Sequence, residues 1–150
     1  LSGFRVPVLP GDAAADLFRL VRDRGLDLIQ LVAPTTPRER VRKILSHCSG
    51  FVYCIAVAGT TGERERVAES LLEQLRWLRE ETTLPLAVGF GIGKPEHVDP
   101  LRGLADGAIV GSALVRHLEP TADNARSIDE ALGPVRELAD RMVAACARRP

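Results

Sequence analysis

Short apolar runs alternate along the chain with stretches whose apolar residues recur at helical spacing. The runs are nearly continuous and rich in β-branched residues, which is typical of strands buried on both faces. They lie near residues 4–9, 26–32, 51–59, 84–91 and 107–110. Strands that alternate with helices predict repeated βα units and a parallel sheet. We expect residues 1–150 to form a single α/β domain.

Helix boundaries follow from capping residues. Asp12, Thr36 and Ser127 each precede an amphipathic stretch, and Glu39 and Glu130 stand three residues after the last two, as in a capping box.

Three features of the helices are less regular. A further helix is expected from Pro95 to about Leu104, and Gly133-Pro134 should interrupt the last one. Leu71, Leu72, Leu75 and Leu78 form one helical face. Trp77 lies off that stripe, and we expect it to be partly exposed.

Composition excludes several classes of protein. The 150 residues hold 20 Lys and Arg against 20 Asp and Glu, and aromatics make up 4%, so nothing favours nucleic-acid binding. No apolar run approaches the roughly 20 residues of a membrane span. Three cysteines without a Cys-x-x-Cys pair suit reduced thiols in a cytoplasmic protein. His47, His97 and His117 share no metal-ligand spacing, and we expect them on helix surfaces, so no metal is predicted.

Three successive predicted strands end in glycine-rich turns, at residues 59–62, 89–93 and 111–112. The carboxyl ends of parallel strands are where α/β proteins bind ligands. Glycine leaves backbone N–H groups exposed, and a helix beginning at Ser112 would add its own unpaired donors. The pattern favours a phosphate or carboxylate site. The alternative is that these glycines only close short βα turns.

Four segments resemble one family in order and in spacing. "LVAPTTPRERVRKI", "GFVYCIAVAGTTG", "LPLAVGFGI" and "ADGAIVGSALV" are similar to the alpha subunit of tryptophan synthase. The resemblance implies a TIM (β/α)₈ barrel, incomplete here, with the fourth to eighth strands present. It implies a lyase that cleaves indole-3-glycerol phosphate to indole and glyceraldehyde 3-phosphate. It also implies a pyridoxal-phosphate beta subunit as partner in an α₂β₂ complex, and no cofactor in this chain.

The resemblance assigns roles to particular residues. Thr61 lies on the loop that closes over the substrate. The substrate phosphate is held by Gly62, Gly91, Gly111 and Ser112. The indole pocket is lined by Tyr53, Phe90, Leu31 and Ile109.

Departures from the family occur near the start. Val8 stands where the family usually has aspartate, and Arg5 stands where an apolar pocket residue is expected. The family's catalytic glutamate and aspartate correspond to positions before residue 1. No catalytic residue is therefore assigned, and we expect these 150 residues alone to be inactive.

The residues themselves leave two other functions open. One is a different sugar-phosphate barrel enzyme, against which the aromatic pair Tyr53 and Phe90 favours an indole-sized ring. The other is a catalytically silent protein that binds a phosphate ligand or a partner, favoured by the lack of an acid/base pair. Cys54 is expected to be a buried apolar residue, and Asp106 to stabilise the opposite end of the sheet.

Overall fold

The computed structural model describes residues 3–5, 11–56, 69–89, 91–119 and 127–147, with only the backbone described for 3–5 and 11–14. Five parallel strands form one sheet whose spatial order is the chain order. They are β1 (Gly3–Arg5), β2 (Asp27–Val32), β3 (Val52–Ile55), β4 (Leu86–Gly89) and β5 (Gly107–Ala108). The predicted fold class, repeated βα units with a parallel sheet, is confirmed.

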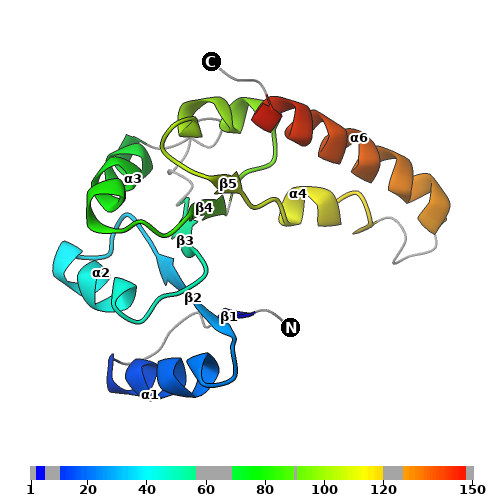
Figure 1. The fold of residues 1–150 in the computed structure, drawn as a ribbon. Coiled ribbons are helices and arrows are strands. Elements are labelled where there is room, and N and C mark those ends of the chain that lie inside the picture. The colour runs from blue at the N-terminus through cyan, green and yellow to red at the C-terminus, as the bar shows by residue number, and fades with distance from the viewer. Residues whose placement is uncertain (1–2, 6–10, 57–68, 90, 120–126, 148–150) are drawn as a thin grey trace.

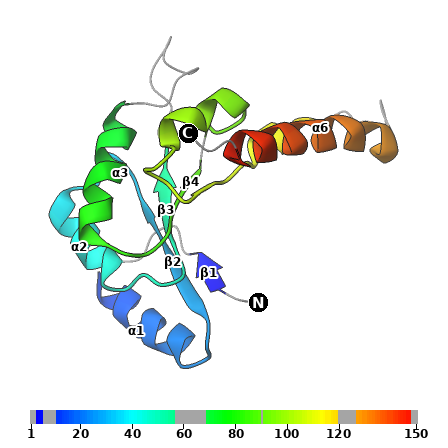
Figure 2. The same ribbon diagram turned by 45° about the horizontal axis from the view of Figure 1, so that its top comes forward.

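The helices of the first units all cover one face of the sheet. Helices α1 (Gly11–Arg22), α2 (Arg38–Leu45) and α3 (Glu69–Glu81) lie on the same side of the strands (Figures 1 and 2). After β4 come two short 3₁₀ helices, η1 (Pro95–His97) and η2 (Asp99–Leu101). The single-turn α4 (Ser112–Val115) and the long α6 (Ile128–Ala147) complete the described elements. Within these residues the sheet is open, because β1 pairs only with β2 and β5 only with β4.

The core lies between the sheet and its helices. Along β2, buried residues alternate with partly exposed ones, so that Leu28, Gln30 and Val32 face the helices. The predicted leucine face of α3 is confirmed, because Leu71, Leu75 and Leu78 are fully buried and Leu72 packs against the same cluster. Burying one such side chain stabilises the fold by about 1.5–3 kcal/mol.

One predicted capping box is present and the other is wrong. Glu130 accepts hydrogen bonds from the Ser127 amide at 2.9 Å and from the Ser127 hydroxyl at 2.8 Å, while the Glu130 amide donates to that hydroxyl at 3.3 Å. Thr36 does not cap α2. Its hydroxyl instead accepts the Ala33 amide at 3.1 Å, closing a turn in which the Thr36 amide bonds the Ala33 carbonyl. Helix α2 begins one residue later than expected, with Pro37 at the cap position.

Two prolines acted differently from expectation. The helix expected over residues 95–104 is two 3₁₀ turns, because Pro100 lacks the N–H that an α-helix needs there. Pro134, by contrast, lies inside α6 and does not interrupt it. A proline removes one hydrogen bond, and a helix of 20 residues with a buried face tolerates that loss.

A further prediction, about the exposure of Trp77, was wrong. Trp77 is buried, at 8% exposed, because the guanidinium groups of Arg38 and Arg42 lie over its ring, 4.9 and 5.9 Å from the centroid. On other helices, the apolar residues Leu20 and Val143 are 51% and 68% exposed. Within the described ranges, no helix combines the length and apolar composition that crossing a membrane requires.

Candidate functional site

The open face of the sheet carries the predicted ring-binding residues. Leu31 pairs in register with Tyr53, and Tyr53 with Ala87. Residues paired in register on parallel strands point to the same face, so these side chains form one row across three strands. Ile109, which directly follows β5, joins that face, because its amide continues the ladder by donating to the Val88 carbonyl at 2.7 Å. The structure therefore brings Leu31, Tyr53 and Ile109 to the face that the helices leave uncovered.

Tyr53 lies against the backbone of β4. Its side chain is 8% exposed, and its ring fills the space beside Gly89 into which a side chain would otherwise project. A glycine at position 89 is thus a packing requirement of Tyr53. The sequence had indicated Gly89 only as part of a turn.

The turns that follow β4 and β5 come together. Gly93 packs against α4, since a Cβ atom at Gly93 would lie 3.0 Å from the Cβ of Ala113. Gly91 has a φ of +80°, a backbone conformation that residues other than glycine rarely adopt. A Cβ atom at Gly91 or at Gly111 would meet no described atom within 4 Å. Two of the three glycine turns therefore lie side by side, with open space at both.

Helix α4 begins at Ser112, as the sequence predicted, with Gly111 as its cap residue. The Gly111 carbonyl accepts the Leu114 and Val115 amides, which leaves the Ser112 and Ala113 N–H groups at the start of the helix without helical acceptors. With only one turn, α4 has little dipole. Any anion here would be held by individual N–H groups and the exposed Ser112 hydroxyl.

His97 is a residue of this region that sequence reasoning missed. It was expected on a helix surface but is 7% exposed. Its ring nitrogen Nδ1 lies 3.0 Å from the Gly91 carbonyl oxygen and 3.3 Å from the Gly93 nitrogen. A histidine four residues after a glycine and two residues after a proline at a helix start was the available signal.

Asp106, Cys54 and Glu96 were not predicted to be site residues, and the structure shows what surrounds each of them. Asp106 lies at the amino end of β5, where it accepts the Leu86 amide at 2.6 Å and pairs with Arg79 at 2.7 Å. Burial raises the pKa of Cys54 to about 12, which leaves a protonated, unreactive thiol. Glu96 is exposed in the first turn of η1. Among the described residues, no group of three His, Cys, Asp or Glu side chains is placed to hold a metal ion.

Three predicted site residues lie outside the described residues: Thr61 and Gly62, which follow β3 in the chain, and Phe90, which follows β4 in the chain. Their predicted roles stay predictions. The site as described therefore consists of the Leu31, Tyr53 and Ile109 face and the adjoining turns at Gly91–Gly93 and Gly111–Ser112.

Parallel strands in chain order, helices on one face and glycine turns at the carboxyl ends of the strands define a (β/α)-barrel protein, of which five consecutive strands are present. A profile of the tryptophan synthase alpha chain family matches residues 1–144. The chain belongs to that family.

Individual relatives agree. The tryptophan synthase alpha chain of Methanocaldococcus jannaschii is 50% identical over 123 residues, which cover 82% of this chain and 44% of that protein. That of Chloroflexus aggregans is 45% identical over 137 residues, which cover 91% and 51%. The alpha subunit of Pyrococcus furiosus superposes with a TM-score of 0.80 at 31% identity, covering 96% of this chain and 56% of that one. The chain thus spans about half the length of these relatives.

Proposed function

We propose that this chain supplies the phosphate-binding and indole-binding side of a tryptophan synthase alpha subunit. The reaction proposed for the whole protein is the cleavage of indole-3-glycerol phosphate to indole and glyceraldehyde 3-phosphate in tryptophan biosynthesis. The observation that carries the proposal is the convergence of the Gly91–Gly93 and Gly111–Ser112 turns beside a face that bears Tyr53 and Leu31. The substrate in this proposal is inferred from membership of the family.

The phosphate would bind at the two turns. Hydrogen bonds from backbone N–H groups to a charged group stabilise binding by about 1.5–3 kcal/mol each. Gly111 leaves the approach clear, because a side chain there would project into open space rather than into the fold. Gly62 and the Thr61 loop are proposed to complete this part of the site.

The indole ring would lie on the open sheet face. Leu31 and Ile109 are partly exposed there, and Tyr53 offers an aromatic wall. Phe90 is proposed as a second aromatic wall. Aromatic pairs gain about 0.5–1.5 kcal/mol beyond their buried area, which favours a planar ring over a bare sugar.

The proposed partner is the beta subunit. One of the similar solved structures is the α₂β₂ tryptophan synthase complex of Pyrococcus furiosus, which covers 96% of this chain at 32% identity with a TM-score of 0.81. A cytoplasmic location and a single domain over residues 1–150 are proposed with it. The three free cysteines suit a reducing compartment.

A second function has one observation in its favour. Among the described residues, Glu96 lies near the turns but is exposed at a helix start, and Asp106 is held by Arg79 at the far end of β5. A silent phosphate-binding protein would need no acid or base here. The two functions differ in whether indole-3-glycerol phosphate is cleaved once the remaining half of the barrel is supplied.

The phosphate site is tested by calorimetric titration with glyceraldehyde 3-phosphate. We expect binding by the wild-type chain and none by Gly111→Val, whose circular dichroism should match the wild type because the new side chain meets no described atom. Unchanged binding in Gly111→Val would reduce these glycines to plain turn residues.

A further inference from the structure

One ring nitrogen of His97 contacts both ends of the turn that follows β4. Nδ1 lies 3.0 Å from the Gly91 carbonyl oxygen and 3.3 Å from the Gly93 amide nitrogen. The Gly91 carbonyl can only accept a hydrogen bond, and the Gly93 amide can only donate one. Nδ1 can therefore make only one of these two hydrogen bonds at a time. When Nδ1 carries a proton it donates to the Gly91 carbonyl, and when it carries none it accepts from the Gly93 amide.

The surroundings of His97 hold its ring in place. Its neighbour Val98 and the nearby Leu101 belong to the hydrophobic core, together with Met142 and Ala145 of α6, which packs against η1. The other ring nitrogen, Nε2, is buried and has no hydrogen-bond partner in the described structure. Hydrogen bonding by this side chain therefore acts on the turn through Nδ1.

The two bonds have different consequences for a ligand. When Nδ1 accepts from Gly93, that amide is engaged by the protein. When Nδ1 donates to Gly91, the Gly93 N–H is left without this acceptor and becomes a donor for an anion at the turn. An anion that accepts from Gly93 therefore favours the form with a proton on Nδ1.

We propose that His97 is a positioning residue of the phosphate-binding turn. Phosphate at Gly91–Gly93 selects the state in which the imidazole holds the Gly91 carbonyl and releases the Gly93 amide. This inference rests on the phosphate site of the proposed function. His97 acts through the backbone of the turn and does not itself contact the reacting atoms.

Three variants separate hydrogen bonding from packing. His97→Asn keeps a polar atom at the position of Nδ1, whereas His97→Gln moves it outward and His97→Leu removes it while filling the space. A net hydrogen bond is equivalent to about a two- to tenfold change in affinity. We expect His97→Leu and His97→Gln to bind glyceraldehyde 3-phosphate more weakly by that factor, and His97→Asn to bind within about twofold of wild type.

Nitrogen-15 NMR of wild-type protein labelled at histidine measures the Nδ1 chemical shift, which phosphate would not change if His97 only packed against its neighbours. The His97 signals are assigned by their absence from His97→Asn. On addition of inorganic phosphate, we expect the Nδ1 shift to move from that of an acceptor nitrogen to that of a protonated one. This spectrum decides the question even if His97→Leu fails to fold.

The outcomes separate the two claims. If wild type binds, Gly111→Val does not, and His97→Leu binds like wild type, the role of His97 is overturned and the phosphate site stands. An unchanged Nδ1 shift on phosphate binding also overturns it. If wild type binds no phosphate, the proposed function fails and the inference fails with it.

Discussion

The phenol ring of Tyr53 occupies the space in which a side chain on Gly89 would lie, with its Cε1 atom 2.8 Å from the position of a Cβ atom there. The two residues are on neighbouring strands and on the same face, since Ile55 pairs with Gly89 in register. Carbon atoms in contact are normally about 3.5–4.0 Å apart. The smallest possible side chain on Gly89 thus requires Tyr53 to move from the proposed ring-binding face.

Gly89→Ala should therefore destabilise the fold. Overpacking typically costs about 1–3 kcal/mol, and the measurement is the free energy of unfolding in urea. Gly107→Ala is the matched control, because it lies on the adjacent strand and its Cβ would contact Ala87 at an ordinary 4.0 Å. Adding Tyr53→Leu to Gly89→Ala should recover part of the loss. Equal effects at Gly89 and Gly107 would contradict this packing.

The three cysteines should differ in reactivity. Cys146 is exposed, whereas Cys48 and Cys54 are buried, and burial raises the pKa of both buried thiols. Because the thiolate is the reactive form, a thiol reagent should modify one cysteine in the folded protein and three in denaturant. Cys146→Ser should leave none reactive before unfolding. Rapid labelling of that variant in the folded state would show the core to be open.

The same burial makes the fold sensitive to alkali. The pKa of Cys54 is raised from 9.0 to about 12 in the folded chain. Between these values the thiol ionises in the unfolded state and stays protonated in the folded one, so the free energy of unfolding falls as pH rises through this window. The decline should be shallower in Cys54→Ala. Parallel pH profiles of the two proteins would contradict the assignment.

The ion pair between α2 and α3 predicts that the stability of the fold depends on pH in the acidic range. Nε and Nη2 of Arg42 donate hydrogen bonds to the Glu81 carboxylate, at 3.0 and 2.7 Å, and these bonds lower the Glu81 pKa from 4.5. A lowered carboxylate pKa stabilises the folded state above 4.5, and that contribution is lost as pH falls through the folded value. Surface pairs contribute little, so the effect should be small.

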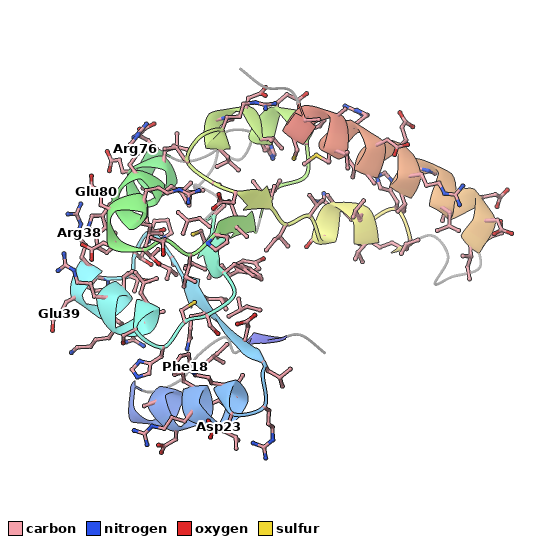
Figure 3. All side chains as sticks on the ribbon, viewed as in Figure 1. Phe18, Asp23, Arg38, Glu39, Arg76 and Glu80 are labelled. Carbon is pink, nitrogen blue, oxygen red and sulfur yellow. The ribbon has the colours of Figure 1, made fainter. Side chains whose placement is uncertain are left out.

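The fluorescence of Trp77, the only tryptophan of the sequence, follows unfolding beside this pair. Urea midpoints between about pH 5 and pH 3 should fall less steeply in Glu81→Gln than in wild type. Glu80→Gln is the control, because Glu80 points outward from the same helix (Figure 3). If Glu80→Gln flattened the acid dependence as much as Glu81→Gln, the pair with Arg42 would not be its cause.

Local pattern predicted most of the scaffold. The strands, the leucine face of α3 and the Ser127–Glu130 box depend on residues within one or two turns of each other, which a sequence shows directly. The Thr36 cap failed because a competing turn with Ala33 took its hydroxyl. Choices between such local bonds are settled by geometry that spacing alone does not give.

The remaining errors involve partners distant in sequence. Trp77 is buried by Arg38 and Arg42, which lie on another helix. His97 was expected at the surface because it stands among residues of a predicted helix surface, but the packing of α6 against η1 encloses it. Gly89 could not be interpreted without the position of the Tyr53 ring. Each depends on tertiary contacts that periodicity does not report.

We propose that residues 1–150 bind indole-3-glycerol phosphate, and we expect no cleavage of it by these residues alone. Breaking the carbon–carbon bond of indole-3-glycerol phosphate needs positioned acid and base groups, which typically contribute about 10²- to 10⁴-fold each. The family resemblance assigns those groups to carboxylates outside residues 1–150, and the described Glu96 is exposed at a helix start.

The most direct test is to titrate the 150-residue chain with indole-3-glycerol phosphate in a calorimeter and to assay the same solution for free indole. We expect saturable binding that Gly111→Val abolishes, and no indole released above the buffer blank. Absence of binding would contradict the proposed site. Indole release by these residues alone would contradict the division between binding and chemistry.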